Sequence, residues 1–242
     1  MSGVRNRILI GDIRERLADV PARSIDCVIT SPPYFQLRDY GVRGQIGLEP
    51  SVEGWVDELR LALNGLKRVL KPTGSIWVNL GDTYSRHAKY GAPPKGLLLA
   101  PERFLLAMAD DGWIVRNKVI WAKTNPVPSS VHDRLSCTYD LVYFFVRERR
   151  YFFDLDAVRI PHTSKRSPSR AKGWSLPFGW RGPSAVGENE GLNRLKAQGQ
   201  VGHPLGKNPG DVWQLPGANF SGAHFATFPP ALVEMPLRAT CP

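Results

Sequence analysis

Along the first 150 residues, short apolar runs rich in β-branched side chains alternate with longer amphipathic stretches. Runs of that length favour strands, and their alternation with helical patterns predicts an α/β fold built on a parallel sheet. The predicted strands are residues 7–10, 26–30, 75–80, 115–121 and 141–147.

Three amphipathic stretches predict helices. Apolar residues recur every three or four positions from Trp55 to Leu70, and the Pro and Gly of residues 71–74 are typical of a helix stop. Residues 101–110 carry a second apolar face, and residues 231–239 form a third helix candidate. Helices of this kind are expected to cover the sheet.

The periodicity ends after Tyr151, and residues 161–211 hold 15 Gly or Pro and eight Lys or Arg against three acids. One interpretation is a disordered linker. However, four aromatic residues lie in or beside this segment, and aromatic rings interleaved with cations suit contact with DNA. The aromatic residues are Trp174, Phe178, Trp180 and Trp213. The candidate DNA-contacting cations are Arg166, Arg170, Lys172 and Arg181.

Composition agrees with a basic globular protein. The chain has 242 residues, 42% of them hydrophobic, which suits one large domain or a domain with an inserted module. A net charge of +10 favours a polyanionic partner, with nucleic acid the leading candidate, although a basic surface without a particular partner is the alternative. No apolar run approaches the roughly 18 residues of a membrane span.

The three cysteines, Cys27, Cys137 and Cys241, are widely spaced and lack the pairing typical of zinc ligands. We therefore expect no metal site and a reducing, cytoplasmic location.

The most distinctive motif is Thr30-Ser31-Pro32-Pro33-Tyr34, directly after a predicted strand. Open α/β sheets bind ligands at the carboxyl ends of their strands. Two prolines stiffen the turn and leave carbonyl oxygens free to accept hydrogen bonds from an amino group. A proline-rich turn that merely ends a strand is the simpler interpretation of Pro-Pro alone.

With its flanking residues, this motif resembles the catalytic D/S/N-P-P-Y/F motif of DNA amino-methyltransferases. Similar segments surround it at residues 10–26, 68–79, 120–125, 134–145 and 151–154. The resemblance covers residues 8–154 and resumes near Asn208. It implies a Rossmann-like methyltransferase core that depends on S-adenosyl-L-methionine, in the circularly permuted order that places catalysis before cofactor binding.

The resemblance also implies a mechanism. The target base would rotate out of the duplex, because a stacked exocyclic amine cannot reach the methyl group. Ser31 and the carbonyl of Pro32 would accept hydrogen bonds from that amine, beside Pro33, and Tyr34 would stack on the base. No protein nucleophile is implied, so we expect Cys27 to be a packing residue.

Serine in this motif favours cytosine N4 as the target, whereas aspartate is commoner in enzymes that act on adenine N6. Adenine therefore stays an alternative. Related Pro-Pro motifs serve glutamine methylation on proteins, and a catalytically dead DNA-binding remnant is a further possibility from another class.

The cofactor-binding part is expected near the end of the chain. The run His224-Phe225-Ala226-Thr227-Phe228-Pro229 resembles the family segment around the methionine end of the cofactor. The cofactor-side candidates are Asp12, His224, Phe225, Ala226, Phe228 and Pro229. Asp12, after the first predicted strand, could equally cap a helix.

A glycine-rich cofactor loop of the F-x-G-x-G type does not occur in this sequence. We therefore expect an incomplete core that binds cofactor weakly unless a further segment or a complementing chain is supplied. The expected division is a catalytic part at residues 1–160, a target-recognition insert at 161–208, and the start of the cofactor-binding part at 209–242.

Overall fold

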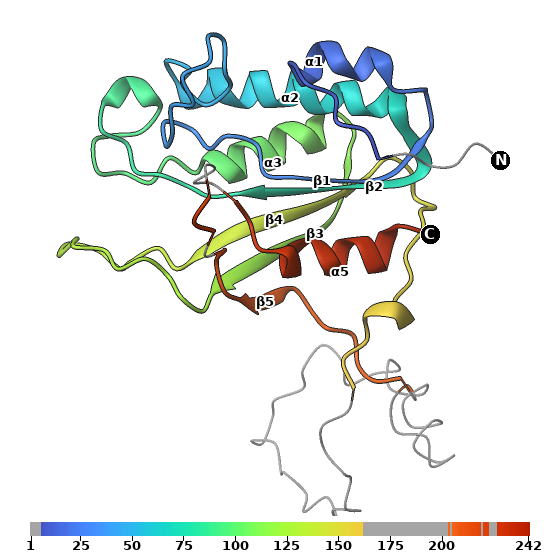
Figure 1. Ribbon diagram of the computed structural model, residues 1–242. Helices are drawn as coiled ribbons and strands as arrows, with labels where there is room; N and C mark the ends of the chain where they lie inside the picture. Colours follow the sequence, from blue (N-terminus) through green and yellow to red (C-terminus); the bar gives the residue numbers. More distant parts are fainter. Residues whose placement is uncertain (1–5, 162–202, 204, 219, 223–226) are drawn as a thin grey trace, which may run out of the picture. The chain divides into compact units, whose positions relative to one another are not determined.

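The structure is a computed structural model that describes residues 6–161, 203, 205–218, 220–222 and 227–242. It divides into two compact units, Met1–Asp154 with Gly210–Pro242, and Leu155–Pro209. The first unit holds a five-stranded sheet with helices on both faces (Figure 1).

The sheet has the strand order β1-β2-β4-β3-β5. Its strands are β1 (Ile25–Thr30), β2 (Leu70–Leu80), β3 (Ile114–Lys123), β4 (Tyr139–Val146) and β5 (Val212–Leu215). β1 runs parallel to β2, and β3 parallel to β5, but β4 is antiparallel to both of its neighbours. The α/β class is confirmed, whereas the expected all-parallel sheet is wrong. The chain between β3 and β4 contains no helix, and a parallel pair needs a crossover connection.

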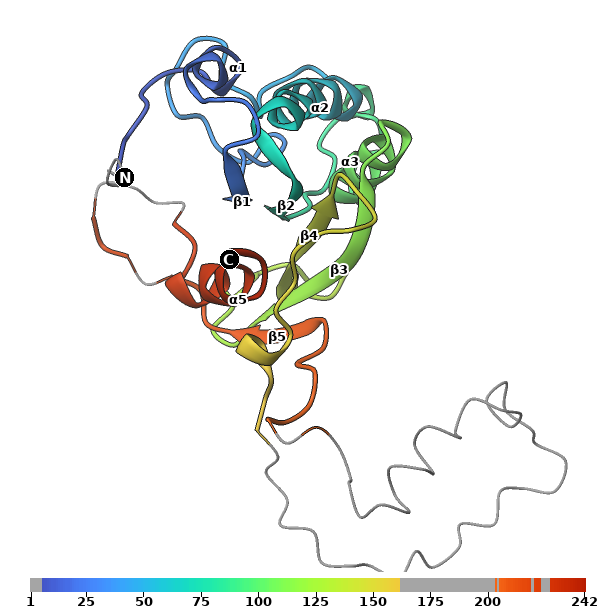
Figure 2. The same ribbon diagram turned by 90° about the vertical axis from the view of Figure 1, so that its right-hand side faces the viewer.

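The helices are α1 (Ile13–Arg16), α2 (Val52–Val69), α3 (Ala100–Asp110) and α5 (Pro230–Thr240), with 3₁₀ turns η1 (Leu17–Asp19), η2 (Ala88–Tyr90) and η3 (Asp156–Val158). The three long helices agree with the predicted ones. α2 and α3 cover one face of the sheet and α5 lies against the other (Figure 2). The side chain of Ser51 caps α2 by accepting a hydrogen bond from the backbone N–H of Gly54.

The alternation of side chains along β2 and β4 fills both faces. On β2, Ile76 and Val78 pack under α2 and α3, while Trp77 joins the cluster on the opposite face, where its ring stacks on Phe144 with centroids 4.1 Å apart. Both strands are almost wholly buried. The two clusters hold these central strands in a fixed register.

Two local predictions are wrong. Residues 7–10 do not form a strand, since no neighbouring strand pairs with them, and Ile8 and Ile10 are 91% and 89% exposed. The expected helix stop at residues 71–74 lies inside β2, which begins at Leu70 because that residue already pairs with Ile25 of β1.

The second unit is described only near its ends. Arg159 pairs with Asp156 at 2.6 Å, and Ile160 forms a β-bridge with Lys207. The predicted DNA-contacting residues Arg166, Arg170, Lys172 and Arg181 lie outside the described residues. Across the described ranges, no helix is long and apolar enough to span a bilayer.

Candidate active site

The Ser31-Pro32-Pro33-Tyr34 turn leaves the carboxyl end of β1, and the helical face anchors it. The indole N–H of Trp55, a buried residue of α2, donates to the carbonyl oxygen of Pro33 at 2.9 Å. Gly47 packs against the other side of Pro33, and its positive φ of 113° favours glycine. Within the described part of the chain, the Pro32 carbonyl accepts no hydrogen bond. That oxygen stays available to a ligand.

Asn79 of β2 joins the two polar side chains of the turn. Its Nδ2 donates to the carbonyl of Leu141 at 3.1 Å, so its Oδ1 faces the turn as an acceptor. Ser31 Oγ lies 3.3 Å and the Tyr34 hydroxyl 3.0 Å from that oxygen. When Ser31 donates its proton to Asn79, the lone pairs of its hydroxyl oxygen remain free to accept from an incoming N–H.

An ion pair extends this network. The Tyr34 hydroxyl lies 3.1 Å from Oδ2 of Asp140, and Lys123 Nζ lies 2.9 Å from the same oxygen. Burial and then the negative charge of Asp140 raise the pKa of Tyr34, so the phenol keeps its proton at neutral pH. The single proton can serve only one acceptor, and the carboxylate is the stronger one. The ring of Tyr34 is therefore held at its hydroxyl end.

A cavity of about 400 Å³ opens beside this network. Tyr34, Lys123 and Asp140 line it, together with residues of the loops after β2 and before α3. Gly81 brings the backbone against the Tyr34 ring: a Cβ at that position would lie 2.6 Å from Tyr34 Cε2 and 2.9 Å from Asp140 Oδ1. The cavity thus has an aromatic wall whose position depends on a glycine.

Asp82, next to Gly81, supports the cavity without reaching a ligand. Its carboxylate accepts backbone N–H groups of Thr83, Leu99 and Ala100 at 2.9–3.1 Å, which ties the loop after β2 to the first turn of α3. Burial raises its pKa, and the three backbone hydrogen bonds act in the opposite direction. We assign Asp82 a structural role.

The cofactor-side candidates are only partly visible. His224, Phe225 and Ala226 lie outside the described residues. Phe228 is half-buried and leads through Pro229 into α5, beside a hollow of about 10 Å³ at Thr30 and Asn79, which is room for about one water molecule. That hollow is far too small for S-adenosyl-L-methionine, and the assignment of Phe228 and Pro229 to the cofactor stays a prediction.

Asp12 acts as a helix cap in this structure. Its carboxylate accepts the backbone N–H of Arg14 at 2.8 Å and pairs with the guanidinium of that residue, which lowers the pKa of Asp12 to about 2. Its predicted contact with the cofactor stays a prediction.

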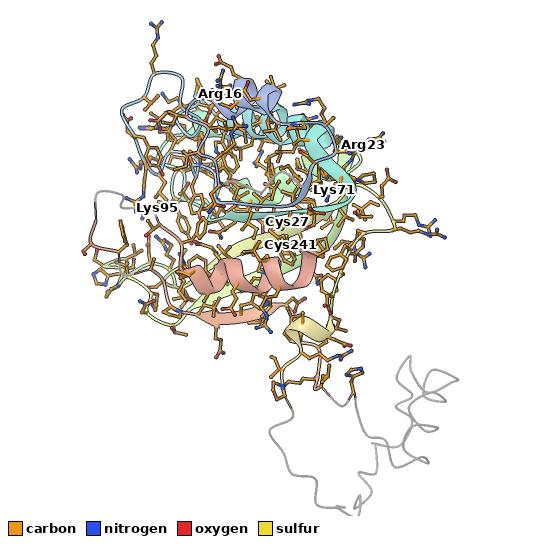
Figure 3. The ribbon with its side chains drawn as sticks, turned by 45° about the vertical axis from the view of Figure 1, so that its right-hand side comes forward. Arg16, Arg23, Cys27, Lys71, Lys95 and Cys241 are labelled. Carbon is orange, nitrogen blue, oxygen red and sulfur yellow. The ribbon has the colours of Figure 1, made fainter. Side chains whose placement is uncertain are left out.

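Cys27 of β1 lies on the α5 side of the sheet, near Cys241 (Figure 3). Its Sγ is 3.4 Å from Oγ1 of Thr240, which also accepts the indole N–H of Trp77. Burial raises the pKa of the Cys27 thiol, so the nucleophilic thiolate is disfavoured. Of the described His, Cys, Asp and Glu side chains, no three are grouped so that they could hold a metal ion.

Sequence reasoning missed three residues of the network: Asn79, Lys123 and Asp140. Asn79 had a readable signal, because a single amide interrupts the apolar run of residues 76–80. Lys123 and Asp140 end β3 and begin β4, and only the antiparallel pairing of those strands brings them to the same edge as Tyr34.

A mixed sheet with this turn at the carboxyl end of β1 defines the S-adenosyl-L-methionine-dependent methyltransferase fold. The solved structure of the PvuII DNA methyltransferase, described as cytosine-N4-specific, superposes on it with a TM-score of 0.61. The match covers 96% of this chain and 69% of the other, at 19% identity.

Residues 25–242 match the N6_N4_Mtase family model, a DNA methylase family, and the chain belongs to that family. Type II methyltransferase M.XycI of Xanthomonas campestris pv. cyanopsidis is 32% identical over 251 residues, covering 95% of this chain and 71% of the relative. Type II methyltransferase M.SfiI of Streptomyces fimbriatus is 40% identical over 174 residues, covering 68% of this chain. The match spans 41% of the Streptomyces enzyme.

Proposed function

We propose that this chain carries the target-amine site of a DNA methyltransferase that modifies cytosine at its exocyclic N4. The methyl donor is S-adenosyl-L-methionine, and the substrate is a base rotated out of double-stranded DNA into the cavity beside Tyr34. Its amine points at Ser31 and Pro32, which precede Tyr34 in the turn and are not among the lining residues of that cavity. Family membership supports the reaction class, and the orientation of Ser31 carries the assignment of the site.

The chemistry requires a neutral amine whose lone pair points at the methyl carbon. The exocyclic nitrogen forms a bond to that carbon while the carbon–sulfur bond breaks, and the methylated nitrogen then loses a proton to solvent. Two acceptors, Ser31 Oγ and the Pro32 carbonyl, take the two N–H groups of the amine and so fix the direction of its lone pair. Catalysis then comes from positioning and electrostatics rather than from a protein nucleophile.

Ser31 supports cytosine over adenine, because serine in this motif is typical of family members that act on cytosine N4, whereas aspartate is commoner in those that act on adenine N6. The Ser31 hydroxyl is neutral and donates to Asn79, so the amine meets a polarised oxygen rather than a carboxylate. The amine needs to lose its proton only after methylation makes it acidic, which removes the need for a strong base in the turn. Methylation of adenine N6 is the second candidate, because both bases present an exocyclic amine to the same pair of acceptors.

We propose further that tight cofactor binding requires polypeptide beside the outer edge of β1. All six residues of that strand are only half-buried, and the apolar Ile8 and Ile10 are exposed. β1 is an edge strand of the sheet, and an unpaired strand edge can accept a further strand. The added polypeptide would complete a cofactor site of which the described residues form one wall.

The test is transfer of a labelled methyl group to unmodified duplex DNA, followed by mass spectrometry of the nucleosides. The chain is assayed alone and with the part of M.XycI that lies outside the matched region. We expect N4-methylcytosine from the complemented reaction and little from the chain alone. N6-methyladenine would overturn the choice of base. Salt-sensitive DNA binding without any product would favour a DNA-binding remnant.

A further inference from the structure

A second, larger hollow adjoins the target cavity. It has a volume of about 740 Å³ and shares Leu37, Asp82, Tyr84 and Cys137 with the smaller cavity as lining residues. The proposed function does not use it. Both hollows lie within the first compact unit, so their adjacency does not depend on the second unit.

Tyr84 lines both hollows, and the cation of Arg134 stacks on its ring. The guanidinium of Arg134 lies over the ring of Tyr84, 3.7 Å from its centroid. Its Nη1 donates to the carbonyl oxygen of Leu135 at 3.1 Å and lies 3.8 Å from Cys137 Sγ, and its other N–H groups can donate to a phosphate. Arg134 is half-buried, so part of its guanidinium remains accessible from the hollow.

Two further cations lie on the rim. Arg86 is exposed, and Lys95 projects from the loop before α3 with 85% of its side chain exposed (Figure 3). Two acids also line the hollow. Asp82 is already committed to three backbone N–H groups, whereas Asp133 pairs with Lys95 at 2.8 Å. Exposed pairs of this kind are weak, so a phosphate can replace Asp133 as the partner of Lys95.

We propose that this hollow binds the DNA strand that carries the target base, holding the sugar-phosphate next to the rotated nucleotide. The inference rests on the proposed function. Tyr84 and Arg134 separate the two nucleotides, with the target base on the Tyr34 side and the adjacent phosphate against Arg134. Arg86 and Lys95 contact the phosphates on either side.

The chemistry of the lining favours a nucleic-acid strand over a small anion. Three cations line the hollow and can each contact a phosphate, and Tyr84 and Tyr90 offer aromatic surface for a sugar or base. The volume lies within the roughly 300–1,000 Å³ of sites that hold a small molecule, which suffices for one nucleotide. Because the hollow adjoins the target cavity, a strand bound in it can place its next nucleotide in that cavity.

The experiment measures binding of the full chain to a fluorescent 12-nucleotide single strand and to a duplex, by anisotropy across a series of salt concentrations. The variants are Arg134→Gln, Lys95→Gln and Asp133→Asn. Arg149→Gln is the control, because it removes the same charge from an exposed position beyond the opposite end of β4. No methyl donor is needed.

We expect Arg134→Gln to weaken single-strand binding about fivefold to tenfold and to reduce the salt slope by about 0.7, the loss of one phosphate contact. Lys95→Gln should weaken binding less. Asp133→Asn should strengthen it about twofold to threefold, because it frees Lys95 for phosphate. The control should keep wild-type affinity.

Equal losses in Arg134→Gln and Arg149→Gln would overturn the proposal, since only net charge would then matter. Unchanged affinity in Arg134→Gln, Lys95→Gln and Asp133→Asn would overturn it as well, while leaving the proposed function standing. A wild-type chain that binds neither probe would contradict the proposed function itself.

Discussion

The two faces of the sheet differ in how completely other parts of the chain cover them. On the face covered by α2 and α3, Trp55, Phe104 and Tyr143 are fully buried in one continuous cluster. On the other face, α5 is the covering helix among the described residues, and β1 at the edge stays half-buried along its whole length. The comparison teaches that the Ser31-to-Tyr34 turn takes its rigidity from the first face, through Trp55, whereas the described residues cover the second face less completely.

The largest expected effect comes from removing the residue that links the first face to the catalytic turn. Trp55→Ala leaves a large cavity under α2 and deletes the donor to the Pro33 carbonyl. We expect a loss of about 3–5 kcal/mol in the free energy of unfolding, measured in urea.

Trp55→Phe sharpens the same test. It retains most of the volume and loses only the hydrogen bond, so the cost should be about 1–2 kcal/mol. An alanine variant as stable as the wild type would contradict the view that this cluster anchors the turn.

The next prediction concerns methyl-transfer activity rather than the free energy of unfolding. Gly81→Ala places a methyl group 2.6 Å from the ring of Tyr34, and the ring or the strand must move. We expect methyl transfer by the complemented chain to fall about 100-fold, because small displacements at a positioned site are costly. The control is Gly54→Ala in α2, where the added Cβ meets its nearest neighbour at 3.6 Å. Equal activities of the two variants would show that Tyr34 tolerates displacement.

The smallest effect concerns a charge cluster on the outside of the first face. The guanidinium of Arg60 donates to Asp111 at 2.6 Å, and this pairing lowers the pKa of the Asp111 carboxyl below its ordinary value of 3.8. A lowered folded-state pKa gives stability that is present above the ordinary value and is lost as the pH falls through the folded value.

Arg60→Gln should therefore unfold at slightly lower urea than the wild type at pH 7, and the gap should close as the pH falls below 3.8. Asp57→Asn removes only the weaker i,i+3 partner of Arg60 and should leave the pH dependence unchanged. A gap of constant size from pH 7 to the acid limit would contradict the assignment.

The sequence predicted the parts of the molecule in which a local pattern decides the structure. The leucines of α2 were readable because burial repeats at helical spacing, and β2 and β4 because each contains a continuous apolar run. The Ser31-to-Tyr34 turn was readable from its two prolines. The direction of β4 was not readable, since an apolar run looks the same in either orientation. Residues 7–10 carried a strand pattern but lack a pairing partner, so the pattern alone could not form a strand.

In the candidate site, too, the residues of a local motif were predictable and their distant partners were not. Ser31 and Tyr34 lie in one short motif, but their partners are 45 to 106 residues away in sequence and meet them only through the sheet. Asn79 stands out as the one amide in an apolar run, but only strand register shows that it shares an edge with Asp140.

The central claim is that Ser31, oriented by Asn79, receives the target amine. Its most direct test is methyl transfer to duplex DNA by Ser31→Ala in the complemented chain. Ser24→Ala, at the other end of β1, is the matched control. The account predicts a loss of about 100-fold or more for Ser31→Ala at unchanged unfolding stability, with the control near wild type. Full activity of Ser31→Ala would contradict the account.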